Sequence, residues 1–378
     1  MSGNTKKLKA IIKNNESNTN GANNPPKYHF KNLVFEGGGV KGIAYVGALE
    51  VLNEEGILQN IERVAGTSAG AMVAVLVGLG YTAEEMKDVL WNIKFRNFLD
   101  KSWGLIRNTG RLIEDYGWYK GEFFRDLMAG YIKAKTGDGE VTFKDIEKMR
   151  QEGKPFRDIY LIGADLSTGL SKVFSAATTP DVKVADAARI SMSIPLIFAA
   201  VKGIKGDDHI YVDGGLLENY AIKVFDRKDY VVDEVNARKT EYYKKINKKL
   251  KSKNIITLER DINDVNEFVY NKETLGFRLD ANEDINLFLD PNAKPKTKKI
   301  DDIISYTTAL VTTLIDFQNN VHLHSDDWQR TVYIDTLGVS SLDFDISDSK
   351  KQKLVDSGIS HTKAYLEWYN NDEEKHNK

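Results

Sequence analysis

Cysteine is absent from the 378-residue sequence, which excludes disulfides, thiolate metal sites and a cysteine nucleophile. Only seven prolines stand against 29 glycines, a balance that favours compact turns over proline-rich linkers. No run of 18 uncharged apolar residues occurs, because the best candidate, residues 65–79, is shorter and interrupted by glycines. The first residues also lack the apolar stretch of a secretory signal. We therefore expect a cytoplasmic protein without a transmembrane helix.

Net charge of one sign is missing as well. The 53 Lys and Arg residues against 55 Asp and Glu residues leave a formal charge of −2, so no overall positive field exists to hold nucleic acid. A hydrophobic fraction of 41% with 29% charged residues is ordinary for a globular chain. At roughly 150 residues per domain, the length predicts one large domain or two.

The chain ends differ in composition from the rest. Residues 1–27 are rich in Asn, Lys, Gly and Ser and include Pro25-Pro26, and such a segment buries too little apolar surface to offset its chain entropy. We predict a disordered polar tail there and a second one over residues 371–378. Residues 28–370 show no internal repeat and no linker, so we predict a single domain with C-terminal elaborations.

Strand and helix patterns alternate along this domain. An apolar run at residues 31–36 stops at three glycines and predicts a strand, followed by a helix that ends at Gly56. A strand at 61–65 and a very apolar helix that ends at Gly80 come next. The later predicted strands are 159–164, 209–212, 254–258 and 331–334, and the later predicted helices are 184–192, 303–317 and 347–368. This alternation predicts a three-layer α/β/α fold around a mostly parallel sheet.

The first glycine cluster matches a nucleotide-binding pattern. Residues Gly37 to Gly42 read G-x-G-x-x-G between a predicted strand and a predicted helix, where a dinucleotide pyrophosphate would bind. In that fold an acidic residue should end the second strand, but here the strand leads from Ala65 into Gly-Thr-Ser-Ala-Gly. An NAD-type oxidoreductase therefore remains only an alternative.

The second glycine cluster explains the first. Gly66-x-Ser68-x-Gly70 between a strand and a helix has the form of a nucleophile elbow. The Ser68 hydroxyl would stand at a helix N-terminus, which favours developing negative charge. If Ser68 attacks an acyl carbonyl, the bare amides of Gly37, Gly38 and Gly39 would serve as an oxyanion hole at the same edge of the sheet.

A serine nucleophile needs a base. None of the six histidines has the setting of a catalytic histidine late in a hydrolase chain, and His322 and His324 come nearest. Asp213 is better placed, because it ends a predicted strand and precedes Gly214-Gly215. Asp165, which follows the predicted strand 159–164, is its rival. Taken alone, either aspartate is more often a turn or capping residue.

In this order, Gly37 to Gly42, Gly66 to Gly70 and Asp213-Gly214-Gly215 resemble the three signature blocks of the patatin-like phospholipases. The resemblance is strong over residues 31–221, where Ser191 to Phe198 also resembles a family segment near the active site. It continues more weakly through residues 273–277 and 330–335, which resemble bacterial-type members. One departure is Ala221, where the family often has proline.

The resemblance implies a lipid acyl hydrolase of the phospholipase A or lysophospholipase type, working through an acyl-enzyme. It assigns Ser68 as nucleophile, Asp213 as base and Gly37, Gly38 and Gly39 as the oxyanion hole. Lys41 takes the family's basic position, where it would steady the loop or approach a substrate phosphate. The resemblance implies no metal and no cofactor. A non-catalytic lipid-binding or storage protein of the same fold remains an alternative.

Two further stretches bear on partners. Residues 238–253 hold eight cations and one acid, Glu241, and favour a solvated helix face over a site that docks an anionic membrane. The aromatic stretch 91–124 favours buried core over a cap on an acyl pocket. We expect a lipid ester substrate, transient contact with a membrane surface, no nucleic acid, and leave open an activating partner.

Overall fold

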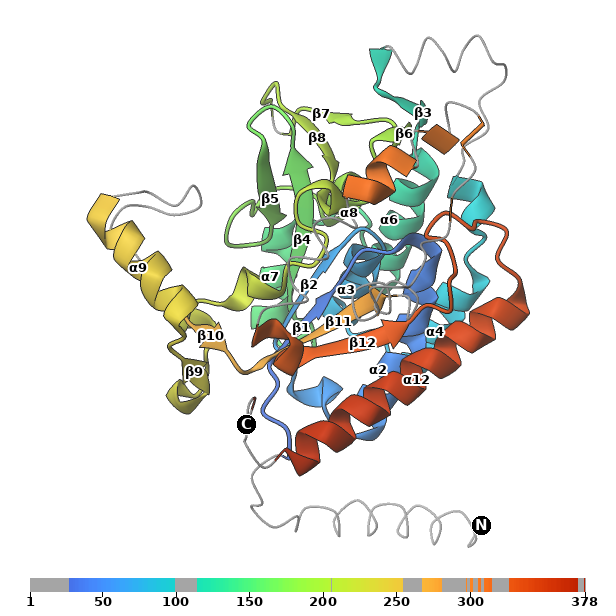
Figure 1. The fold of residues 1–378 in the computed structure, drawn as a ribbon. Helices are drawn as coiled ribbons and strands as arrows, with labels where there is room; N and C mark the ends of the chain where they lie inside the picture. Colours follow the sequence, from blue (N-terminus) through green and yellow to red (C-terminus); the bar gives the residue numbers. More distant parts are fainter. Residues whose placement is uncertain are drawn as a thin grey trace, which may run out of the picture.

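A central β-sheet runs through the computed structural model (Figure 1). The residues that the structure describes are 27–98, 114–204, 206–253, 267–280, 297, 300, 301, 305, 306, 309–314, 326–372 and 377. The predicted tail 1–27 lies outside these residues except for Lys27. Of the predicted tail 371–378, Asn371 ends a helix, and Asp372 and Asn377 are also described. The predicted strand 254–258 and the candidates His322 and His324 lie outside the described residues. The predicted domain boundaries therefore stay predictions.

Five neighbouring strands form the parallel part of the sheet. Their order is β12 (Thr331–Asp335), β11 (Thr274–Asp280), β1 (Asn32–Phe35), β2 (Arg63–Thr67) and β4 (Asp158–Asp165). Three further strands pair antiparallel. β8 (Ile210–Asp213) and β5 (Leu170–Phe174) pair with β4, and β7 (Val201–Lys202) pairs with β8. Two separate pairs are β3 (Gly117–Tyr119) with β6 (Leu196–Phe198) and β9 (Ala237–Arg238) with β10 (Tyr270–Asn271).

Helices cover the sheet because its strands alternate between two buried faces. Leu33 and Phe35 of β1 pack into the main core with the larger helices, whereas Val34 faces a smaller cluster built on Ile222 and Phe225. The α-helices are α2 (Ala44–Glu54), α3 (Ala69–Gly78), α4 (Ala83–Asn92), α6 (Glu122–Thr136), α7 (Phe143–Gln151), α8 (Val184–Ser191), α9 (Glu241–Lys253) and α12 (Asp348–Asn371). Short 3-10 helices, including Ile222–Phe225, cover the other face. The predicted α/β fold around a mostly parallel sheet is confirmed.

Most predicted elements have a counterpart within a few residues, but one central strand is missing from the prediction. β11 lies between β12 and β1, and the sequence pattern predicts no strand or helix for its residues. Of the predicted helix 303–317, the described residues 305, 306 and 309–314 are helical. Among the helices of the described residues, none combines the length and apolar character needed to cross a membrane.

β2 and β8 meet end to end along β4. A strand has two edges, and β5 takes one edge of β4 over residues 161–165. β2 therefore shares the other edge with β8: β2 pairs as far as Thr67 with Ile162, and β8 runs in the opposite direction to end with Asp213 beside Gly163. The carboxyl ends of the two strands thus face each other, and this register brings residues 68 and 213 together.

Candidate active site

Ser68 stands in a strained turn between β2 and α3. Its backbone has φ 55° and ψ −123°, a left-handed conformation that non-glycine residues rarely adopt. A Cβ atom at Gly66 would lie 2.1 Å from Gly70 O, and one at Gly70 would lie 2.3 Å from Phe35 O. Both glycines are therefore required by the close approach of backbone in the turn. The Ser68 side chain is presented directly before the first residue of α3, as the elbow motif predicts.

Asp213 is buried beside Ser68. Its Oδ1 accepts the N–H of Gly215 (2.7 Å), and its own N–H donates to Ser193 O (2.9 Å). Burial raises the pKa of Asp213 to about 7, while the hydrogen bonds from Gly215 and from the Ser68 side chain act in the opposite direction. The structure therefore places the two predicted catalytic residues beside each other in the wall of one cavity.

The end of α8 holds both residues in place. Ser191 Oγ accepts the N–H of Ser68 (2.9 Å) and donates to Ile162 O (2.6 Å). Met192 Sδ lies 3.6 Å from Ser68 Oγ. Sequence reasoning placed this segment near the active site but assigned no role to Ser191. A buried serine that ends a helix gives no signal in the sequence that separates it from an ordinary core residue.

The glycine turn lies against Ser68 and Asn219. A Cβ atom at Gly37 would lie 2.4 Å from Asn219 Oδ1 and 3.0 Å from Ser68 Cβ. Two amides of the turn are engaged in the fold: Gly37 N–H donates to Asn219 O (3.1 Å) and Val40 N–H to Ser341 O (3.0 Å). Within the part of the chain that the structure describes, the amides that remain for an oxyanion in the predicted set are those of Gly38 and Gly39.

Ser68, Asp213 and the glycine turn line one cavity of about 60 Å³, which we call the Ser68 cavity. Its lining residues are Gly37, Gly38, Gly39, Ser68, Ile194, Ile197, Asp213, Asn219, Val311, Thr312, Ser341 and Leu342. Ligand pockets usually measure about 300–1,000 Å³, so this cavity suits a reacting ester group rather than a whole lipid. None of these lining residues is aromatic.

The other predicted site residues lie outside the Ser68 cavity. Lys41 belongs to the 3-10 helix Gly39–Ile43 and is not among the lining residues. Asp165 accepts hydrogen bonds from Ser167 N (2.9 Å) and contacts His209 Nδ1 (2.7 Å), and so caps a turn. None of the described histidines lines the cavity. The described residues also contain no group of three His, Cys, Asp or Glu side chains placed to hold a metal ion.

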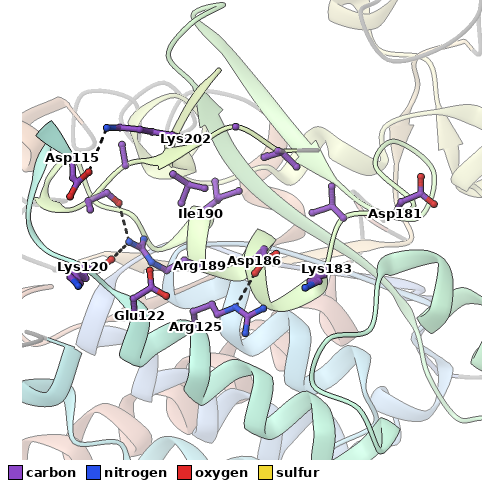
Figure 2. Close-up of a pocket in the computed structure, with 16 residues that line it drawn as sticks. Asp115, Lys120, Glu122, Arg125, Asp181, Lys183, Asp186, Arg189, Ile190 and Lys202 are labelled. Atoms are coloured by element: carbon purple, nitrogen blue, oxygen red, sulfur yellow. Dashed lines mark hydrogen bonds and ion pairs between the residues drawn. The ribbon is translucent and has the colours of Figure 1, made fainter. Parts of the chain in front are cut away.

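A second cavity, of about 660 Å³, lies on the outer side of α8 (Figure 2). Two ion pairs lie within its walls, since Arg125 contacts Asp186 (2.9 Å) and Lys202 contacts Asp115 (3.5 Å). Arg125 and Lys183 also contact Glu140, which does not line the cavity. Arg189 donates to Ser193 Oγ and to Ala199 O. This larger cavity contains neither Ser68 nor Asp213, so size alone does not identify the reactive site.

Comparison with known proteins agrees with this geometry. The sequence model of the family described as patatin-like phospholipase matches residues 33–226. The uncharacterised Bacillus subtilis protein YqhO is 28% identical over 345 residues, which are 88% of this chain and 97% of that protein. The probable lipid hydrolase 463L of Invertebrate iridescent virus 6 is 29% identical over 204 residues, 53% of this chain and 64% of that protein.

A solved structure shares the fold. VipD from Legionella pneumophila superposes with a TM-score of 0.52 at 16% sequence identity, over 90% of this chain and 67% of VipD. At that identity the likeness concerns the fold alone. It extends beyond residue 226, so the second half of the chain also follows a known architecture.

Proposed function

This chain belongs to the patatin-like phospholipase family, and from that premise we propose that it is a lipid acyl hydrolase of the phospholipase A or lysophospholipase type. The observation that carries the proposal is the meeting of the Ser68 hydroxyl, the Asp213 carboxylate and the glycine turn in one cavity. A nucleophile, a base and bare amides at one point are the requirements of acyl transfer.

In the proposed reaction, Ser68 Oγ attacks the ester carbonyl and its proton passes to Asp213. The carbonyl oxygen becomes an oxyanion that accepts hydrogen bonds from the N–H groups of Gly38 and Gly39. The C–O bond to the leaving alcohol then breaks, and this alcohol takes the proton from Asp213. Water then attacks the acyl-enzyme while Asp213 takes its proton. The bond between the acyl carbon and Ser68 Oγ breaks, and Ser68 Oγ takes the proton back from Asp213 as the fatty acid departs.

The environment of Asp213 suits a base in this reaction. A general base works best when its pKa lies near the working pH, and burial raises the pKa of Asp213 to about 7. Only the ionised carboxylate accepts the serine proton. We therefore expect the rate of ester hydrolysis to fall as the pH drops below about 7.

The first test is a substitution of the nucleophile. Ser68→Ala should abolish hydrolysis of mixed phospholipids, with products resolved by mass spectrometry, while leaving the fold intact. Ser175→Ala is a matched control, because Ser175 is also buried but hydrogen-bonds to Thr178 and Thr179 away from the cavity. A fluorophosphonate should label the wild-type chain and Ser175→Ala, but not Ser68→Ala. Retained turnover in Ser68→Ala would end the proposal.

The second test compares the two aspartates. Asp213→Asn should lose nearly all activity, whereas Asp165→Asn should keep kcat within a few-fold of the wild type because Asp165 caps a turn. The reverse order would assign the base to Asp165. Binding of a dinucleotide in a thermal-shift assay, without labelling of Ser68, would instead favour the oxidoreductase alternative.

The partners follow from the substrate class. We propose a lipid ester as substrate and transient contact with a membrane surface, because a lipid acyl hydrolase meets its substrate at an interface. Among the described residues of α9, Lys244, Lys245 and Lys248 are exposed, while Tyr243 is buried. This pattern agrees with a solvated basic face. A cytoplasmic location and an activating partner remain predictions.

A further inference from the structure

Three charged side chains are buried behind the glycine turn. Glu36 directly follows β1 and precedes Gly37, while Arg278 and Asp280 belong to β11. The side chains of Glu36 and Arg278 are 1% exposed, and that of Asp280 is 13% exposed. Arg278 Nη2 lies 2.9 Å from Asp280 Oδ1, and Arg278 Nε lies 3.7 Å from Glu36 Oε1. None of the three lines the Ser68 cavity, so the proposed reaction does not use them directly.

The Glu36 carboxylate instead binds the groups that hold the turn. Its Oε2 accepts the N–H of Leu279 (2.7 Å), and its Oε1 accepts Nδ2 of Asn219 (3.3 Å). Asn219 Nδ2 also donates to Gly37 O (3.2 Å), and Asn219 O accepts Gly37 N–H (3.1 Å). Glu36 therefore orients the side-chain amide of Asn219. Asn219 in turn contacts both the C=O group and the N–H group of Gly37.

Leu279 provides a second contact with the turn. A Cβ atom added at Gly38 would lie 2.6 Å from Leu279 Cδ1, so the Leu279 side chain packs directly against Gly38. Because Leu279 N–H is held by Glu36, the position of this side chain also depends on the carboxylate. Both contacts act on the glycine turn, which lines the Ser68 cavity.

We propose that Glu36 is a positioning residue for the reaction at Ser68: its carboxylate, balanced by Arg278, holds Asn219 and Leu279 against the glycine turn and so keeps the Gly38 and Gly39 amides at the cavity. This inference rests on the proposed function. It also explains why the Glu36 carboxylate is buried. A buried charge destabilises the fold unless it is paired and hydrogen-bonded, and an ionised acceptor binds N–H donors more strongly than a neutral one.

Several charged or titratable groups surround the Glu36 carboxylate. They are Arg278 and Asp280 on β11, Lys41 in the 3-10 helix before α2, Tyr45 on α2 and Tyr333 on β12. Burial raises the pKa of Glu36 to about 7 against the opposing effect of Arg278. Glu36 therefore titrates in the same pH range as Asp213, and both carboxylates must be ionised for full activity.

Glu36→Gln in the full chain tests the role of the charge. We expect kcat for a p-nitrophenyl ester to fall about 10- to 100-fold with little change in KM, since loss of an oxyanion donor costs about 10²–10³ in kcat and displacement of donors should cost less. The matched control is Glu273→Gln. Glu273 is equally buried and directly precedes β11, at the end of the strand away from Arg278 and Asp280. Its carboxylate accepts hydrogen bonds from the N–H groups of Val232 and Asp233. A wild-type kcat in Glu36→Gln, or an equal loss in Glu273→Gln, would overturn the proposal.

The pH profile separates positioning from simple structural support. Between about pH 7 and 5, log kcat of the wild type should fall with a slope steeper than 1, because protonation of Glu36 adds its 10- to 100-fold loss to the loss caused by protonation of Asp213. In Glu36→Gln the slope should not exceed 1, while Glu273→Gln should keep the wild-type profile. A wild-type slope that nowhere exceeds 1 contradicts the inference without any variant, even if Glu36→Gln fails to fold.

A measurement independent of turnover distinguishes this inference from the proposed function. The N–H groups of Gly37 and Val40 donate to Asn219 and Ser341, so they should exchange slowly with deuterium in the wild type. In Glu36→Gln the peptide that contains them should exchange faster, whereas α3 should not change. Unchanged exchange would overturn the role of Glu36. If the wild type neither cleaves esters nor reacts with a fluorophosphonate, the proposed function fails, whatever the exchange result.

Discussion

At the scale of single residues, the environment of Asp213, which suits its proposed role as a base, also makes it a source of instability. Its carboxylate is buried, and no cation is among the groups that shift its pKa. Desolvation of the charged form raises this pKa to about 7. A base with this pKa is half ionised near neutral pH, which serves proton transfer, but its ionised form is poorly solvated in the fold.

Asp213→Asn should therefore stabilise the protein while it abolishes activity. An unfolded aspartate titrates near 3.9, so between about pH 4 and 7 the folded wild type binds more protons than the unfolded chain, and its stability falls as the pH rises. Asparagine removes this effect and retains an oxygen for Gly215 N–H. At pH 8 we expect Asp213→Asn to have a higher Tm than the wild type and a free energy of unfolding larger by roughly 2–4 kcal/mol at most. Near pH 4 we expect no gain in either quantity. Thermal melts at both pH values test this, and a lower Tm at pH 8 would contradict it.

Some residues of the site are marked by a local sequence motif, and others are not. Ser68 and Asp213 each stand beside glycines at a strand end, and that combination predicted where both would lie. Ser191 and Glu36 act through buried hydrogen bonds to backbone groups far along the chain. No local pattern marks such contacts, because they depend on which strands become neighbours. Sequence reasoning therefore predicts Ser68 and Asp213, which we propose as the reacting groups, but not the residues that hold them.

At the scale of elements, the end of α8 links the two halves of the site. Ser191 satisfies both Ser68 N–H and Ile162 O at the point where β2 stops pairing with β4. Ser191→Ala would leave these two buried groups without a partner, which costs about 1–3 kcal/mol for each such group. We expect a lower Tm and a kcat reduced about 10-fold, since Ser68 loses a restraint on its strained backbone. A kcat equal to that of Ser175→Ala would show that α8 does not position Ser68.

Two elements show where pattern reasoning fails. β11 has the alternation of a strand in Leu275, Phe277 and Leu279, but Gly276 and the buried Arg278 between them hide it. β8 was expected from its apolar residues, yet its antiparallel direction, which sets Asp213 opposite Ser68, is a property of the pairing. Direction and neighbour order arise from tertiary contacts, which a local pattern does not contain.

The crossing of α2 and α12 depends on glycine. A Cβ atom at Gly47 would lie 2.0 Å from Val355 O, and one at Gly358 would lie 2.0 Å from Ala44 O. Gly47→Ala should therefore force the helices apart and destabilise the protein by about 1–3 kcal/mol or more. Gly130→Ala in α6 is the matched control, because its Cβ would meet nothing within 4 Å, and it should stabilise by about 0.5–1 kcal/mol. Denaturant unfolding measures both, and a stabilised Gly47→Ala would refute the close crossing.

At the scale of the whole molecule, the site is built from both halves of the chain. Residues beyond 226, where the match to the family ends, supply β11 beside β1, α12 against α2 and Ser341 in the wall of the Ser68 cavity (Figure 1). Asp226 is joined to Arg330 by two contacts of 2.6 and 2.7 Å, and both side chains are fully buried. The second half therefore contributes residues to the same hydrophobic core as the first.

A fragment that ends at Asp226 tests this unity. Its β1 would lose β11, Glu36 would lose Leu279 and Arg278, and Asp226 would become a buried charge without Arg330. Breaking a buried ion pair alone costs about 3–5 kcal/mol, a large part of the 5–15 kcal/mol by which most domains are stable. We expect no cooperative thermal transition and no fluorophosphonate labelling of Ser68, whereas a control fragment that ends at Asp372, and so keeps α12, should show both. Labelling of the short fragment at the wild-type rate would mean that the turn at Ser68 and Asp213 assemble without β11. Glu36 would then position the glycine turn through its contact with Asn219 alone, without the contact with Leu279.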